Sequence, residues 1–257
     1  MKAASIGMQW SFSTDHVRST SSISPDHAAE YAMLRDMAAA HARVRDAIER
    51  AAAEGASIIC LAASTLPVLE HVIPDWLLAV SSGLTICLET FTGAGTDKRT
   101  IADPTSINSR RAWVLQDGQV VVGPERQLVV DSRSGARAST ALRAELLSGR
   151  RTVPLAHGVG VLLICGEILF FEGSKRSSEG VSLPKAQASD WWEALPQPVV
   201  VLNPTHTPMK LPAIDDKRRW ASRRGAVLAP NNSAPAVDRR DGRWGWKTDG
   251  RTGFAYV

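Results

Sequence analysis

The sequence predicts a layered α/β fold, because a strand, a long helix and a second strand follow one another near its start. We expect the first strand at 3–10, the helix at 25–53 and the second, buried strand at 57–61. This order forms a βαβ unit, which is typical of layered α/β proteins. Further strand-like apolar runs occupy 84–88, 159–165, 198–202 and 226–228. The chain has 257 residues, 44% of them hydrophobic, and we expect one domain with a substantial core over 1–257.

The long helix is predicted from both its ends and its periodicity. Ser24 is a suitable capping residue, Pro25 suits the first turn, and Asp26 lies at the positive end of the helix dipole. Gly55 follows the predicted end, as a C-cap glycine does. Apolar residues recur every three or four positions and form one stripe: Met33, Met37, Ala40, Val44, Ile48 and Ala51.

A β-hairpin is predicted around Asp117-Gly118. These two residues separate the apolar runs at 110–115 and 119–122, and Asp-Gly in that position is a strong hairpin signal. The remaining elements are less sharply marked. We expect short helices at 75–80, 140–147 and 215–224, and a turn at 238–242 within a final meander of short strands.

Composition limits the classes of function. The three cysteines form neither a disulfide framework nor a CxxC metal pattern, which indicates a reducing compartment, and we expect a cytoplasmic protein. Cys60 and Cys87 lie in apolar strand-like runs and are interpreted as structural. The chain shows no signal peptide and no membrane-spanning run, so we expect a soluble protein. It also lacks a phosphate-cradling glycine loop and metal-ligand spacing, so we expect neither cofactor nor metal.

The densest basic cluster runs from Lys217 to Arg224. A basic patch can bind nucleic acid, but this one lies on a short predicted helix, where a solvated charged face is the usual state. The net charge is only +4. A nucleic-acid partner is therefore an alternative that rests on charge alone, and we do not expect one.

Cys165 stands near the end of the most apolar run of the chain. Within the stretch from Val159 to Ile168, the run between Gly158 and Gly166 is predicted as a buried strand that ends at the cysteine. Gly166 lets the backbone turn sharply after it, so the thiol can project from the end of a sheet into a cleft. The alternative is that Cys165 is a small buried hydrophobic residue, as most free cysteines are.

Several segments, in the same order, resemble the nitrilase or carbon–nitrogen hydrolase superfamily. They are Gly55–Leu61, Ile107–Val114 with Asp117-Gly118, Leu163–Ile168, Val199–Pro204, and Arg219–Ala221 followed by Val227–Ala234. The resemblance implies a four-layer αββα sandwich of two mixed sheets with helices outside, and a homodimer. A glutamate two residues after the cysteine, here Glu167, is typical of the apolipoprotein N-acyltransferase branch. Similar nitrilase-like domains occur in conjugal-transfer proteins of plasmids.

Members of that superfamily use a glutamate as general base, a lysine that stabilises the oxyanion, and a cysteine nucleophile. The segment Leu61–Pro67 resembles the glutamate-bearing segment but has Ala63 at the glutamate position, and alanine cannot accept a proton. At the lysine position the chain has Glu125, or Arg126 if the match shifts by one residue. Arginine could stabilise an oxyanion, although its planar group does not simply replace lysine. Only the cysteine of the triad is retained with its chemistry.

We therefore expect a carbon–nitrogen hydrolase-like protein with a degenerate triad and weak, altered or absent amidase activity. The predicted catalytic residues are Cys165, Arg126 and Glu167, and the substrate would be a small amide or acyl compound. Asn203 and His206, after the strand at 198–202, are predicted to bind substrate, although a loop histidine is commonly satisfied by water. One alternative is an active cysteine amidase or N-acyltransferase with a substituted base, for which the available carboxylates are Glu70, Glu89, Glu125 and Glu167. The other is a non-catalytic ligand-binding or assembly protein.

Overall fold

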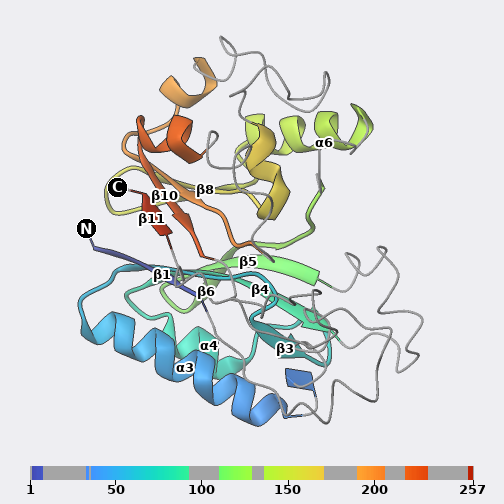
Figure 1. Ribbon diagram of the computed structural model, residues 1–257, viewed down its shortest axis with the longest axis vertical. Coiled ribbons are helices and arrows are strands. Elements are labelled where there is room, and N and C mark those ends of the chain that lie inside the picture. The colour runs from blue at the N-terminus through green and yellow to red at the C-terminus, as the bar shows by residue number, and fades with distance from the viewer. Residues whose placement is uncertain are drawn as a thin grey trace, which may run out of the picture.

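Two mixed β-sheets pack face to face, and helices cover their outer faces (Figure 1). The computed structural model describes residues 2–7, 33–34, 36–92, 110–128, 136–170, 190–205, 218–230 and 254–256. The α/β class predicted from the sequence is confirmed, and so is its arrangement as a sandwich of two sheets between two helical layers. No helix within these ranges is long and apolar enough to cross a membrane.

The first sheet comes from the N-terminal half of the chain. Its strands are β1 (Ala3–Ile6), β2 (Ile58–Leu61), β4 (Thr85–Thr92), β5 (Arg110–Gln116) and β6 (Gln119–Glu125), in the order β1-β2-β4-β5-β6. The first three run parallel, whereas β5 and β6 form an antiparallel meander on β4. A short strand, β3 (Leu66–Val68), also pairs with β4 and was not predicted.

The second sheet comes from the C-terminal half. Its order is β11-β10-β9-β8-β7, and the strands are β7 (Thr152–Pro154), β8 (Val159–Leu162), β9 (Val199–Leu202), β10 (Ala226–Ala229) and β11 (Phe254–Tyr256). The central strands β8, β9 and β10 are parallel and carry antiparallel neighbours at both edges. Their apolar sequences suit strands that are covered on both faces.

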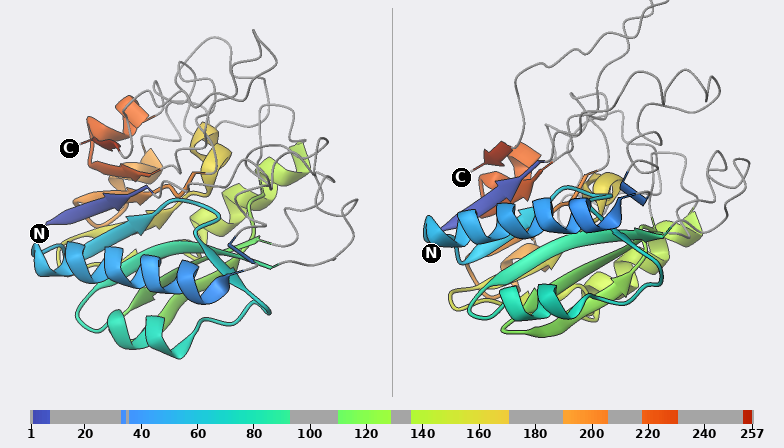
Figure 2. Two further views of the ribbon diagram at one scale, coloured as in Figure 1. Left: turned by 60° about the horizontal axis from the view of Figure 1, so that its bottom comes forward. Right: turned by 90° about the horizontal axis from the view of Figure 1, so that it is seen from below.

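Helices α3 (Met37–Ala53) and α4 (Asp75–Val80) cover the outer face of the first sheet, as Figure 2 shows. Val44, Ile48 and Leu77 pack there against strand residues. The helix predicted at 25–53 is interrupted by a turn at Asp36, whose side chain accepts the N–H of Ala39 at 3.0 Å and caps α3. The predicted start, at Ser24 and Pro25, lies outside the described residues.

The outer face of the second sheet packs against α6 (Ala136–Leu147) and three tryptophans. Trp192 and Trp220 meet edge to face, with ring centroids 5.5 Å apart, and the guanidinium of Arg224 lies 4.2 Å from the Trp220 ring. Of the helix predicted at 215–224, residues 218–222 are helical. Arg219, Arg223 and Arg224 are exposed, as a solvated helix face requires, whereas Arg218 is buried. Lys217 lies outside the described residues.

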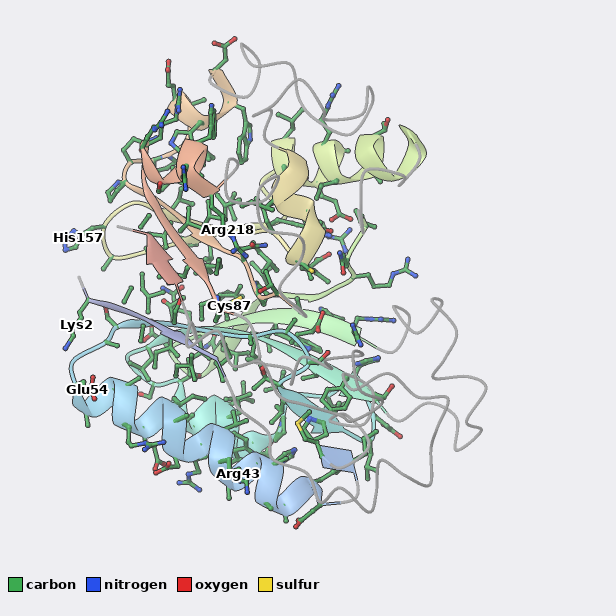
Figure 3. The ribbon with its side chains drawn as sticks, viewed as in Figure 1. Lys2, Arg43, Glu54, Cys87, His157 and Arg218 are labelled. Carbon is green, nitrogen blue, oxygen red and sulfur yellow. The ribbon has the colours of Figure 1, made fainter. Side chains whose placement is uncertain are left out.

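The layer between the sheets is an apolar core that contains all three cysteines. Cys60 and Cys87 pair directly across β2 and β4 and are fully buried, in agreement with the structural role predicted for them. Burial raises the pKa of the Cys87 thiol well above its usual value, and the neighbouring Cys60 and Glu89 add to the rise. Figure 3 shows Cys87 near the centre of the molecule, between the two sheets.

The predicted hairpin is confirmed. Asp117 has a φ of 50° and Gly118 a φ of 78°, which are the left-handed values that a type I′ turn requires at both central residues. Strand β6 continues to Glu125, beyond the predicted end, through shifts of register against β5. This continuation carries Glu125 to a position opposite Ala112, in the core between the sheets.

Candidate active site

Cys165 lies at the turn between β8 and a 3₁₀-helix, Cys165–Phe170. The predicted strand, between Gly158 and Gly166, ends three residues before the cysteine, at Leu162, and the expected sharp turn at the cysteine is present. Cys165 has a φ of 47°, which non-glycine residues rarely adopt, and its N–H donates to the carbonyl oxygen of Pro204 at 2.8 Å. A residue with a strained backbone at a turn between a strand and a helix has the geometry of a nucleophile elbow.

Asn203 holds this turn from the neighbouring strand end. Its side chain is fully buried, and Nδ2 donates to the carbonyl oxygens of Leu163, at 2.5 Å, and Cys165, at 3.1 Å. The Oδ1 atom of Asn203 has no hydrogen-bond partner among the described residues. The structure thus shows Asn203 as a residue that positions the cysteine, and its predicted contact with substrate stays a prediction.

Glu167 is buried directly beneath the turn. One carboxylate oxygen accepts the Ile164 N–H at 2.8 Å and Nη1 of Arg151 at 2.6 Å, and the other accepts the Leu128 N–H at 2.6 Å. Burial raises the pKa of Glu167 to about 7, against the opposing effects of Arg151 and of both backbone donors. These contacts make Glu167 a support for the cysteine turn. Its predicted catalytic role stays a prediction.

The guanidinium of Arg151 joins several elements around Glu167. Besides Glu167, it contacts Glu145 of α6 at 2.6 Å and the carbonyl oxygen of Arg126 at 2.8 Å, and it lies 4.0 Å from Glu125. Burial alone would lower the pKa of Arg151, but the surrounding carboxylates raise it. This network was not predicted, because Arg151 and its carboxylate partners are far apart in the sequence.

The positions matched to the usual glutamate and lysine are both buried, but neither has the expected chemistry. Ala63 follows β2, and its N–H donates to the carbonyl oxygen of Thr205 at 3.2 Å, which joins the ends of β2 and β9. Glu125 points into the core and forms an ion pair with Arg150 at 3.1 Å. The side chain of Arg126 is exposed, so its predicted role at the oxyanion stays a prediction.

A buried carboxylate approaches the Ala63 segment from β4. Glu89 is 1% exposed, and its Oε2 accepts the N–H of Ser64 at 2.8 Å. Ser64 has a φ of 51°, and its Oγ has no hydrogen-bond partner among the described residues. Glu70, by contrast, is exposed. His206 lies outside the described residues, and its predicted role is untested.

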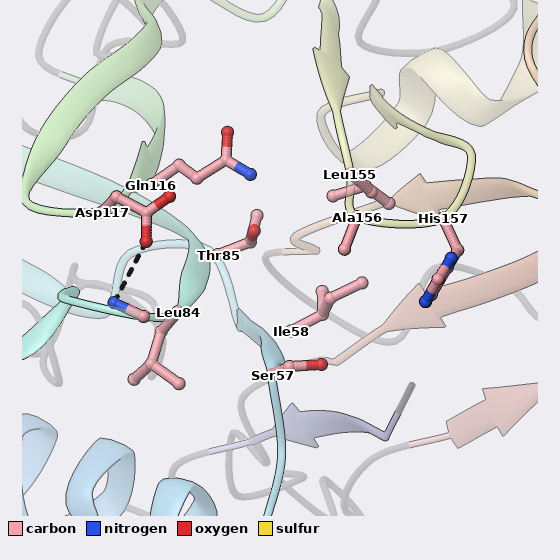
Figure 4. A pocket seen from close by; sticks show the side chains of 10 residues that line it. Ser57, Ile58, Leu84, Thr85, Gln116, Asp117, Leu155, Ala156 and His157 are labelled. Carbon is pink, nitrogen blue, oxygen red and sulfur yellow. Dashed lines mark hydrogen bonds between the residues drawn. The ribbon is translucent and has the colours of Figure 1, made fainter.

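The described residues also form a cavity of about 310 Å³ at the opposite end of the strands (Figure 4). It lies beside Ile58 and Thr85, where β2 and β4 begin, and beside the turn between β7 and β8 that contains His157. Asp117 lines its wall and accepts the Gly83 N–H at 3.1 Å. None of the residues predicted as functional lines this cavity.

No protein-family model matches the sequence, and no curated protein matches it either. Several solved structures show a distant likeness in their backbones. A glutamine-dependent NAD⁺ synthetase from Acinetobacter baumannii has 14% identity and a TM-score of 0.42 over 79% of this chain. The chain covers only 36% of that synthetase.

Two smaller proteins show a similar likeness. An amidase from Nesterenkonia sp. AN1, with the acetamide moiety of fluoroacetamide added covalently at its active-site cysteine, has 14% identity and a TM-score of 0.41 over 78% of this chain and 72% of its own. A carbon–nitrogen hydrolase from Helicobacter pylori has 11% identity and a TM-score of 0.40 over 85% of this chain and 75% of its own. At these scores the likeness is too distant to support a functional argument.

Proposed function

We propose that the chain is a nitrilase-like protein of cysteine-dependent carbon–nitrogen chemistry, in which Cys165 forms a thioester with a small amide or acyl substrate. The observation that carries the proposal is the left-handed backbone of Cys165 at the turn after β8. Strained backbone of this kind persists only where the surroundings enforce it, and it is concentrated at functional sites. Here Asn203 and Pro204 enforce it through hydrogen bonds.

The reaction proposed is acyl transfer through sulfur. The thiol of Cys165 loses its proton, the sulfur bonds to the acyl carbon, and the C–N bond breaks as the amine leaves with a proton. Water or another amine then cleaves the thioester and restores the thiol. Ala63 and Glu125 replace the usual base and cation, so we expect turnover of ordinary amides to be slow, since a base or an oxyanion donor each contributes about 10²-fold or more.

The test is the pH dependence of Cys165 alkylation by iodoacetamide, followed by peptide mass spectrometry. Cys60 and Cys87 serve as internal controls because both are fully buried in strands. We expect Cys165 to react at least tenfold faster than either control, with a midpoint below the free-thiol value of about 8.5. Equal, slow labelling of all three thiols would rule out a nucleophilic Cys165.

A non-catalytic role in ligand binding or assembly is the second candidate, and the observation that favours it is the ion pairing of Glu125. An anion held by Arg150 and Arg151 stands where the resemblance places a free cation. If Cys165 is unreactive, the non-catalytic role is the better supported of the two. The homodimer predicted from the resemblance is then the first assembly to test, by sedimentation.

A further inference from the structure

We propose that Glu89 is the general base for Cys165 and replaces the glutamate that the resemblance places at position 63. The proposal rests on the proposed function, because it assigns the proton acceptor of that same site. It differs from the usual arrangement in that the carboxylate comes from the middle of a strand, β4, and not from the segment that follows β2.

The register of the first sheet directs Glu89 toward the cysteine. Glu89 pairs directly with Ala112 and lies two residues from Cys87, so all three side chains emerge from the same face of the sheet. Ala112 and Cys87 belong to the core between the sheets, and so does Cys165. Glu89 therefore places a buried carboxylate in the layer that contains the thiol.

Ser64 links this carboxylate to the active-site end of the strands. Three non-glycine residues in the described chain have a left-handed backbone: Ser64, Asp117 and Cys165. Asp117 belongs to the hairpin turn, which requires that conformation. The other two, Ser64 and Cys165, follow the ends of β2 and β8. In this conformation the N–H of Ser64 donates to Oε2 of Glu89 at 2.8 Å.

Two backbone hydrogen bonds hold the Ser64 segment beside the cysteine turn. Ala63 donates to Thr205, and Cys165 donates to Pro204, so both segments are tied to the same three-residue stretch after β9. The methyl group of Ala63 is fully buried. A glutamate there would add a second carboxylate to the buried space that Glu89 already occupies, and like charges in such proximity repel. Alanine at position 63 is thus compatible with an ionised Glu89.

The other carboxylates are committed to Arg151. Both oxygens of Glu167 accept hydrogen bonds, from Arg151 and from two backbone N–H groups, and Glu125 pairs with Arg150 and lies near Arg151, so both carboxylates are held in structural contacts. Glu89 accepts the backbone N–H of Ser64. In the proposed step the Cys165 proton moves to Glu89, the thiolate attacks the acyl carbon, and Glu89 returns the proton to the leaving nitrogen, so protons balance over the step.

The test compares alkylation of Cys165 across pH 5–10 in the wild type, Glu89→Gln, and the double variant Ala63→Glu with Glu89→Gln. Because Glu89 accepts the thiol proton as the sulfur attacks, labelling of the wild type should follow the ionisation of Glu89. Without this acceptor, Glu89→Gln should label about tenfold more slowly at pH 7, and the midpoint should move up to that of the unassisted thiol, about 8.5. The double variant should restore the wild-type midpoint, because it returns a carboxylate to the site. Glu70→Gln, which removes an exposed carboxylate, is the matched control and should label as the wild type does.

The outcomes separate the two proposals. A wild-type Cys165 no more reactive than Cys60 and Cys87 would refute the proposed function, and with it the role of Glu89 as a general base. A reactive wild type with an unchanged midpoint in Glu89→Gln would overturn the assignment of Glu89 alone. If Glu89→Gln slowed labelling equally at every pH without moving the midpoint, the substitution would have caused only a structural defect, and the assignment of Glu89 would also be overturned. If Glu89→Gln does not fold, Glu89→Asp replaces it, with a smaller shift of the midpoint expected.

Discussion

The side-chain amide of Asn203 donates to the backbone carbonyl oxygen of Cys165 at 3.1 Å, across the ends of two parallel strands. The same amide binds the carbonyl of Leu163, so one buried side chain satisfies two carbonyl groups of a turn that the sheet no longer pairs. The position of the thiol therefore depends on β9 as much as on its own segment.

Substitution Asn203→Leu should destabilise the protein by roughly 2–4 kcal/mol, because it removes both hydrogen bonds and leaves the carbonyl groups of Leu163 and Cys165 buried without a donor. Urea unfolding followed by circular dichroism measures the effect. Ser222→Ala removes a hydroxyl whose hydrogen bond to Arg219 lies in an exposed region, and it should change stability by less than about 0.5 kcal/mol. Equal effects of both variants would contradict the role assigned to Asn203.

Replacement of Arg151 should be far more damaging than replacement of its neighbour. Arg151→Met leaves Glu145 and Glu167 without their cation in the interior, and a broken buried pair costs about 3–5 kcal/mol. Arg150→Met removes an arginine whose side chain is 61% exposed and should cost no more than about 1 kcal/mol. Chemical denaturation of both variants checks this order. An unchanged free energy of unfolding in Arg151→Met would show that the network adds no stability.

The Glu167→Gln variant should reveal a pH-dependent part of the stability. Burial raises the pKa of Glu167 from 4.5 to about 7, so the folded protein binds this proton more tightly than the unfolded chain does. Its contribution is complete below pH 4.5 and is lost as the pH rises through 7, by about 3 kcal/mol in all.

Unfolding free energies measured from pH 5 to pH 8 test this sign. The wild type should lose stability relative to Glu167→Gln over that interval. Glu49→Gln, which removes an exposed carboxylate on α3, is the control and should run parallel to the wild type. A difference between wild type and Glu167→Gln that stayed constant with pH would contradict the raised pKa.

Gly158→Ala should destabilise the protein strongly. Gly158 has a φ of 92°, and an added Cβ would lie 1.9 Å from the carbonyl oxygen of Pro198. Gly55, with a φ of 86°, has open space at the same point. Gly55→Ala should therefore cost only the left-handed backbone energy, roughly 1–2 kcal/mol, and Gly158→Ala clearly more, because the backbone must also shift. Thermal melts of the pair measure the difference, and similar melting temperatures would contradict the close approach.

The parts of the fold that local chemistry dictates were predictable. The Asp117-Gly118 turn and the apolar stripe of α3 each follow from neighbouring residues, and both are present. Strands β3 and β7 were missed because each is three residues long and contains a proline. The strand predicted between Gly158 and Gly166 ends early, at Leu162, where the side chain of Asn203, which is distant in the sequence, binds the carbonyl oxygen of Leu163.

The site was only partly predictable. Cys165 was found from its own segment, since a glycine follows an apolar run at that point. The network of Arg151 depends on carboxylates from three separate segments, and the approach of Glu89 to Ser64 depends on the pairing of β2 with β4. Such contacts arise from tertiary packing and cannot be predicted from the sequence of any one segment.

The face-to-face packing of two sheets from different halves of the chain has a consequence for assembly. Glu89 lies in the first sheet and Ala63 follows its strand β2, whereas Cys165 and Asn203 follow strands β8 and β9 of the second. A chain cut between residues 128 and 136 would leave each fragment with half of the proposed chemistry. Rapid alkylation of Cys165 should therefore arise late in folding, at the moment when the halves dock, and the thiol would serve as a natural reporter of that final step.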